Sequence, residues 1–258
     1  MWCGGYEDTC ASSCEDIFMV EFSLDGYCEL LSAFKNTGYS FCRFEEIDSR
    51  LREGYPFVVL RHDIDMSLRP ALEIARIEYQ QGIQATYFVL LGSPFYNIFS
   101  RSNVEIITQI HQYGHQIATH LDLAAYDGDC AKALIEVEIL SKWYPFISAE
   151  IASLHSSYEL NQIPIGLFQQ LNNVYGPAVR GDVAYISDST GRWRYGHPLE
   201  SEAFSAQMPI QLLTHPIWWI QEGETAAQKL ERWLYSDYLN SRAMLKEFLP
   251  KLFRLNEQ

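Results

Sequence analysis

The chain has 258 residues, of which 48% are hydrophobic and 20% are charged, so it holds enough apolar side chains for one large core and is not of disordered composition. Nineteen Lys and Arg against 33 Asp and Glu give a net charge of −14, which disfavours binding to nucleic acid or to an anionic membrane surface. No apolar run approaches the length of a membrane span.

The N-terminal region differs in composition from the rest. Residues 1–16 are small, polar and glycine-bearing, and we expect a poorly ordered leader there, followed by a single domain over 17–258. Without a basic segment or an apolar signal-peptide run, we expect a cytoplasmic protein with reduced cysteines. The spacing of Cys3, Cys10 and Cys14 matches no structural zinc site well, so we interpret these residues as ordinary thiols.

Short apolar runs alternate with helical segments along the chain. The runs that predict strands are 17–22, 56–60, 84–90, 116–119, 147–154, 182–186 and 209–214. Apolar spacing predicts helices over 68–79 and 104–110, and a long amphipathic helix over 224–248. This alternation predicts an α/β fold with a parallel sheet, either open or closed into a barrel.

Histidines occur at or just after the C-terminal ends of four predicted strands. They are His62, His120, His155 and His215. Because the C-terminal ends of parallel strands open onto one face, we expect all four imidazoles to converge in one cleft.

Two carboxylates follow the same strand. If the chain is extended through Ile64, Asp63 and Asp65 project to one side of the sheet. Like charges held close together are costly unless a cation or a shared proton lies between them, which favours a metal site. The alternative for Asp65 is to cap the helix that begins near Ser67.

Imidazole and carboxylate ligands suit a divalent metal ion, zinc first, with cobalt, iron or nickel as alternatives. Such an ion lowers the pKa of bound water and polarises a carbonyl group. One carboxylate and one histidine outside the metal ligands then serve as base and acid. The residues therefore predict hydrolysis of an amide or an ester.

Residues 57–219 resemble the polysaccharide deacetylase family, the NodB-homology domains of carbohydrate esterase family 4. RHDID at 61–65 stands where the family has TFDDG, and ATYFV at 85–89 is similar to its ATFFV strand. GHQIATH at 114–120 resembles GHEIGNH, and LTH at 213–215 resembles the family's L-x-H motif. The resemblance implies a distorted (β/α) barrel with fewer than eight strands, which agrees with the seven predicted runs.

The resemblance also implies roles for site residues. It makes Asp63 the catalytic base, Asp65 and His120 metal ligands, and His215 the catalytic acid, although Ile64 between the aspartates leaves their two roles exchangeable. The position of the family's second metal histidine is Ala124. We expect His155 to replace that ligand, with Asp122 as the other candidate.

Other residues resemble parts of the family's pocket. Asp188 with Trp193 is similar to a displaced fourth motif, in which a catalytic Asp tunes the base and a Trp walls the pocket. We expect Trp193, Trp218 and Tyr158 to stack on sugar rings. A local basic patch such as Arg180, Arg192 and Arg194 would offset the charge of a nucleotide-sugar.

The chain is most similar to a divergent branch of the family that occurs with bacterial O-antigen and capsule biosynthesis proteins. This implies a metal-dependent hydrolase that removes an acetyl or similar acyl group from an amino sugar of a surface-polysaccharide precursor. Two alternatives stay open. One is a non-catalytic sugar-binding or complex-forming member, which Ala124 motivates, and the other is an amidase acting on a non-acetyl amide.

Overall fold

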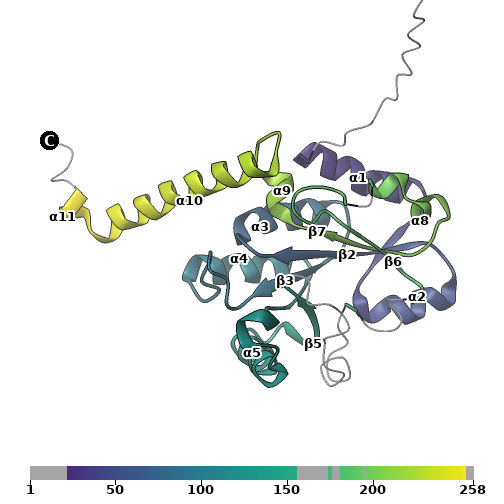
Figure 1. Cartoon of the computed structure of the whole chain (residues 1–258), viewed down its shortest axis with the longest axis horizontal. Coiled ribbons are helices and arrows are strands. Elements are labelled where there is room, and N and C mark those ends of the chain that lie inside the picture. The colour runs from purple at the N-terminus through teal and green to yellow at the C-terminus, as the bar shows by residue number, and fades with distance from the viewer. Residues whose placement is uncertain (1–21, 156–173, 176–180, 195, 254–258) are drawn as a thin grey trace, which may run out of the picture.

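A seven-stranded parallel sheet lies at the centre of the computed structural model, which describes residues 22–155, 174–175, 181–194 and 196–253 (Figure 1). The strand order is β5-β4-β3-β2-β7-β6, and β1 pairs with the first half of β2. All six pairings are parallel. The described residues thus form one α/β domain, as the alternation of strands and helices predicts.

The elements have the following bounds. The strands are β1 (Ser40–Cys42), β2 (Phe57–Ile64), β3 (Thr86–Leu90), β4 (Gln116–Leu121), β5 (Ile147–Leu154), β6 (Ala184–Ser187) and β7 (Ile210–Thr214). The α-helices are α1 (Leu24–Asn36), α2 (Ile47–Glu53), α3 (Leu68–Gln80), α4 (Arg101–Gln112), α5 (Cys130–Trp143), α8 (Glu202–Ser205), α9 (Pro216–Ile220), α10 (Ala226–Phe248) and α11 (Pro250–Phe253). The 3₁₀ helices are η1 (Phe44–Glu46), η2 (Leu123–Tyr126) and η4 (Pro198–Glu200).

Six of the seven predicted strands are confirmed, as β2 to β7. The seventh predicted run, 17–22, lies outside the described residues except for Phe22, as does the predicted leader at 1–16. The remaining strand of the sheet is β1, which the sequence did not predict because three residues are too few to show an alternating pattern.

The sheet is open within the described part of the chain. Its edges are β5 and β6, and no strand among the described residues joins them. The parallel α/β prediction is therefore confirmed, whereas closure into a barrel is not observed. None of the described helices is both long and apolar enough to cross a membrane.

Alternate residues of β2 point into two different environments. Val58, Leu60 and Ile64 belong to the main apolar core, which also contains residues of α1, α3, α4 and α9. Phe57 and Val59 belong to a smaller core on the other face. Arg61 and Asp63 follow these two residues on that second face, which therefore changes from apolar to charged towards the C-terminal end of the strand.

His62 lies on the opposite face of the sheet from Asp63, so the prediction that it joins the other three imidazoles is wrong. Its Nε2 donates to Oε1 of Glu78 at 2.7 Å, and its Nδ1 accepts the hydroxyl of Thr214 at 2.8 Å. The reason is the length of β2, which continues to Ile64 and so keeps His62 within the strand alternation.

Glu78 of α3 is fully buried at the centre of a polar cluster that contains His62. Besides the bond from His62, it accepts hydrogen bonds from the hydroxyls of Tyr27 and Tyr87. Burial raises the pKa of Glu78, but His62, His115 and the Tyr27 hydroxyl outweigh burial and hold that pKa below its usual value. An ionised Glu78 therefore ties α1, α3, β2 and β3 together.

We predict that Glu78→Gln destabilises the fold by about 2–4 kcal/mol, because it replaces a buried charged acceptor with an amide whose NH₂ group faces other donors. Urea unfolding monitored by circular dichroism measures this. The difference from the wild type should shrink as the pH falls below about 4, since a lowered pKa stabilises only the ionised state. Glu73→Gln, at an exposed position of the same helix, should change stability by less than about 0.5 kcal/mol. Equal effects of both variants would contradict the role of Glu78.

Candidate metal centre

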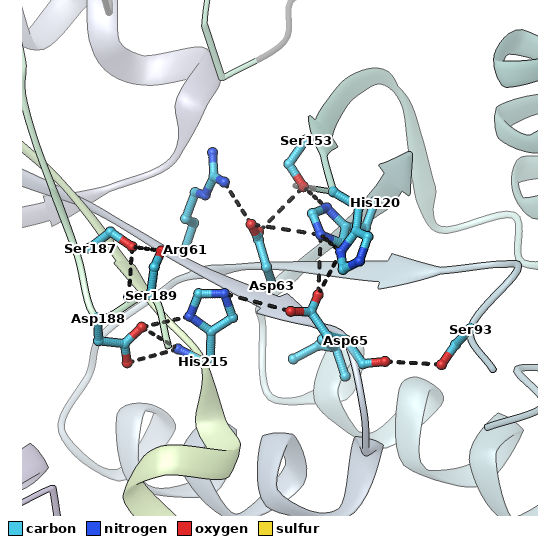
Figure 2. Close-up of polar contacts among 12 residues, drawn as sticks. Arg61, Asp63, Asp65, Ser93, His120, Ser153, Ser187, Asp188, Ser189 and His215 are labelled. Carbon is cyan, nitrogen blue, oxygen red and sulfur yellow. Dashed lines mark hydrogen bonds and ion pairs between the residues drawn. The ribbon is translucent and has the colours of Figure 1, made fainter. Parts of the chain in front are cut away.

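Three side chains converge at the C-terminal end of the sheet (Figure 2). Oδ1 of Asp65 lies 3.2 Å from Nε2 of His120 and 3.3 Å from Nδ1 of His155, and the two nitrogens are 3.3 Å apart. Asp65 follows β2, His120 lies in β4 and His155 follows β5. The three residues are so placed that they could hold a metal ion.

The protonation of these groups also suits a cation. Oδ1 of Asp65 is buried and makes no hydrogen bond. Burial raises the pKa of Asp65, but His120 and His155 outweigh it and hold that pKa well below its usual value. On the far side of its ring, Nδ1 of His120 contacts Oγ of Ser153 at 2.5 Å, and that hydroxyl donates to Oδ1 of Asp63. With a metal ion bound, the imidazole would donate through Nδ1 to this hydroxyl and present the electron pair of Nε2 to the ion.

The structure distinguishes between the two predicted replacements for the ligand missing at Ala124. His155 lies in the cluster, where its backbone N–H donates to the carbonyl of Leu121 at 2.7 Å and extends the β4–β5 pairing by one residue. Asp122 instead caps η2, accepting the N–H of Ala124 at 3.1 Å. Ala124 itself is exposed on η2.

Asp65 does not cap α3, because Ser67 occupies the N-cap position of that helix. The alternative interpretation of Asp65 as a capping residue is therefore wrong.

Asp63 lies beside the triangle of Asp65, His120 and His155 rather than in it. Its Oδ2 is 3.9 Å from Nε2 of His120 and accepts a hydrogen bond from Nη2 of Arg61 at 2.7 Å (Figure 2). Burial raises the pKa of Asp63, but the Arg61 guanidinium and the nearby histidines outweigh burial and lower it. Asp63 is thus an ionised carboxylate next to the candidate metal centre.

Arg61 is a site residue to which the sequence analysis gave no role. It is 1% exposed, and its guanidinium carbon lies 5.5 Å from the ring centres of Phe88 and Tyr175 and 6.0 Å from that of Tyr185. A guanidinium tolerates such surroundings because it is weakly hydrated and stacks on aromatic faces. The available signal was its position two residues before Asp63 in a buried strand, which puts both side chains on one face.

His215 lies on the other side of the triangle. Its Nε2 is 3.8 Å from Oδ2 of Asp65, and its Nδ1 contacts Oδ1 of Asp188 at 2.6 Å. Burial lowers the pKa of His215, but Asp188, Asp65 and Asp63 outweigh burial and raise it to about 9. The carboxylates around His215 thus favour its protonated form.

Asp188 contacts His215, the residue predicted as the acid, rather than Asp63, the residue predicted as the base. It is fully buried, accepts the backbone N–H of His215 and takes a further hydrogen bond of 2.9 Å from Nε1 of Trp219. Its tryptophan partner is therefore Trp219 and not Trp193. The fixed carboxylate determines which imidazole nitrogen of His215 faces the metal centre.

A cleft of about 470 Å³ opens above these groups. Besides the residues already described, it is lined by Tyr175, Tyr185, Ser189, Thr190 and Arg194. These side chains supply two aromatic rings, two hydroxyls and a cation beside the candidate centre.

Apart from Arg194, the predicted substrate-binding residues do not line this cleft where the structure describes them. Trp218 is 5% exposed and belongs to the main apolar core, and Trp193 packs against Phe22 and Trp219. Trp218 also lines a small pocket beside Asp63, Asp65 and His215, and the stacking of these rings on a substrate stays a prediction. Arg192 is exposed away from the cleft lining, and Tyr158 and Arg180 lie outside the described residues.

No protein-family model matches the chain, and no curated protein matches it significantly. The resemblance to polysaccharide deacetylases therefore stays a prediction.

We predict that His155→Ala weakens zinc binding at least about 100-fold, since loss of a ligand should exceed the 10–100-fold cost of losing a supporting residue. Competition with a chromophoric chelator measures the affinity. Asp122→Asn is the matched control, because Asp122 is the alternative ligand and caps η2 in the structure. The zinc affinity of this variant should stay within about threefold of the wild-type value. Zinc loss in Asp122→Asn with retention in His155→Ala would contradict the assignment.

Proposed function

We propose that this protein is a metal-dependent hydrolase that removes an acetyl or similar acyl group from the nitrogen of an amino sugar in a surface-polysaccharide precursor. One observation carries the proposal: a carboxylate, Asp63, and an imidazole, His215, flank the Asp65, His120 and His155 triangle without belonging to it. Amide hydrolysis needs these two groups, a base for the attacking water and an acid for the leaving amine.

The metal would be held by Asp65, His120 and His155, and it would supply a Lewis acid that polarises the scissile carbonyl and acidifies a bound water. Zinc fits the spacing of the three ligand atoms, since a tetrahedral ion with bonds of about 2.0 Å places its ligands about 3.3 Å apart. Cobalt, iron and nickel accept the same ligand types.

Asp63 acts as the base. The Arg61 contact keeps its carboxylate ionised and leaves Oδ2 facing the metal centre at 3.9 Å from Nε2 of His120. Oδ1 is occupied by the hydroxyl of Ser153. Oδ2 also accepts the bond from Arg61 but has a second electron pair, and its position near His120 makes it the proton acceptor that we propose.

His215 acts as the acid. Because Asp188 holds its Nδ1 at 2.6 Å, the proton that can leave towards the substrate is the one on Nε2. His215 gives its Nε2 proton to the leaving nitrogen as the C–N bond breaks. When the products leave, Asp63 releases to solvent the proton that it took from the attacking water, and His215 takes up a proton from solvent. Asp188 is a positioning residue in this scheme.

The cleft suits a carbohydrate. Tyr185 and Tyr175 offer ring faces for a sugar, and Ser189 and Thr190 offer hydroxyls for hydrogen bonds. Arg194 of the predicted basic patch lines the cleft and would meet the phosphate or carboxylate of a nucleotide-sugar or an acidic sugar. We further propose that the open sheet is the described part of a distorted barrel of the polysaccharide deacetylase type.

We predict that Asp63→Asn keeps its zinc but loses at least about 100-fold in the rate of acetate release, because the loss of a general base costs that much. Acetate and ammonia released from a set of N-acetylated hexosamine nucleotide-sugars and oligosaccharides are measured by NMR, with zinc content determined in parallel. The control Asp122→Asn should release acetate at the wild-type rate. Full activity of Asp63→Asn would contradict the proposal, and ammonia without acetate would favour the non-acetyl amidase.

A further inference from the structure

The C-terminal helix α10 projects away from the domain (Figure 1). Only its first turns pack against the body, through Lys229 and Trp233, which are the buried residues of the helix. Nζ of Lys229 donates to the carbonyl of Phe22, and Trp233 packs edge-on against Phe95. From Leu234 to Phe248 every residue except Lys246 is exposed.

The exposed part of α10 carries an apolar seam. Leu234, Tyr238, Leu245 and Phe248 are 53%, 59%, 49% and 80% exposed, and the small Ser241 lies midway. These five positions are separated by steps of four and three residues, the spacing of the contact seam in a two-helix coiled coil. An amphipathic helix was predicted here, but the seam that defines it is not buried.

The seam faces away from the body. Continuing the face that packs onto the body along the helix from Trp233 leads to Ser236, Asn240, Ala243 and Glu247, which are small or polar. The apolar seam is turned roughly 110° around the helix from this face, and Met244 lies between the seam and the face. The helix therefore has one side for its own domain and another side for a partner.

The size of the exposed surface calls for a partner. The seam together with its flanking Tyr235 and Met244 exposes on the order of 700 Å² of side-chain surface, close to the ~800 Å² that one partner contributes to a standard interface. An isolated helix of about 15 residues is also only marginally stable in water.

The charge of α10 allows a second copy of this chain to be that partner. Between Ala226 and Phe248 the helix carries three acidic and four basic residues, so it is a nearly neutral element in a chain of net charge −14. The acids are Glu231, Asp237 and Glu247, and the bases are Lys229, Arg232, Arg242 and Lys246. Two copies can therefore approach along this helix with less repulsion than elsewhere.

The flanking charges also select the direction. Asp237 directly precedes the seam residue Tyr238, and Arg242 directly follows the seam residue Ser241. In a parallel pair, Asp237 of each copy lies across from Arg242 of the other copy, so two opposite-charge contacts form. In an antiparallel pair centred between Ser241 and Leu245, Arg242 of one copy lies across from Arg242 of the other copy. These two like charges repel each other. Glu231 lies seven residues before Tyr238, at the equivalent position of the preceding repeat. Its charge ends the apolar seam at the end of the helix nearest the body.

We propose that α10 joins two copies of this protein in a parallel helical pair along Leu234, Tyr238, Ser241, Leu245 and Phe248. This assignment is independent of the proposed hydrolase activity, because none of these residues lines the cleft.

Sedimentation equilibrium of the full chain from about 5 to 200 μM tests it. The wild type should dimerise, and Leu245→Asp should be monomeric. Asn240→Asp, a matched change outside the seam, should dimerise like the wild type. Circular dichroism and the unfolding midpoint verify that each variant keeps its fold.

A charge swap tests the direction of the pair. Asp237→Arg and Arg242→Asp should each weaken dimerisation about three- to tenfold, and the double variant should recover wild-type affinity. A monomeric wild type over the whole range, or a dimeric Leu245→Asp, would overturn the proposal. A double variant that is weaker than both single variants would overturn the parallel pairing.

Discussion

Burial of charge in β2 is the constraint on which the rest of the structure depends. Arg61, His62 and Asp63 follow one another in the central strand of a sheet that is covered on both faces, and each is at most 4% exposed. An unpaired buried charge costs several kcal/mol, so each side chain must find a partner within its own face of the sheet. The two polar clusters of the protein are the result.

Strand alternation assigns the partners. Arg61 and Asp63 pair with each other on the cleft side, whereas His62 pairs with Glu78 on the helical side. The two clusters are linked through the backbone, because Thr214, which donates to His62, immediately precedes His215. The Glu78 cluster thereby supports the register of β2 and β7, the two strands that carry Asp63 and lead into His215.

Much of this arrangement can be predicted from the sequence. The strands with four or more residues show as apolar runs, and the positions of His120, His155 and Asp65 at strand ends suffice to bring them together. The side of His62 could not be predicted, because the apolar run ends at Leu60 whereas the strand continues through four further residues whose partners stabilise it. The burial of Trp218 depends on how α9 packs against α1 and α3, which local pattern does not encode.

X-ray absorption at the zinc edge of the zinc-loaded full chain tests the central claim most directly, namely that an Asp65, His120 and His155 triangle holds the metal. Our account predicts a first shell of nitrogen and oxygen at about 2.0–2.1 Å with the scattering of two imidazoles, reduced to one in His155→Ala. A sulfur shell at about 2.3 Å would place the metal on cysteines and contradict the account.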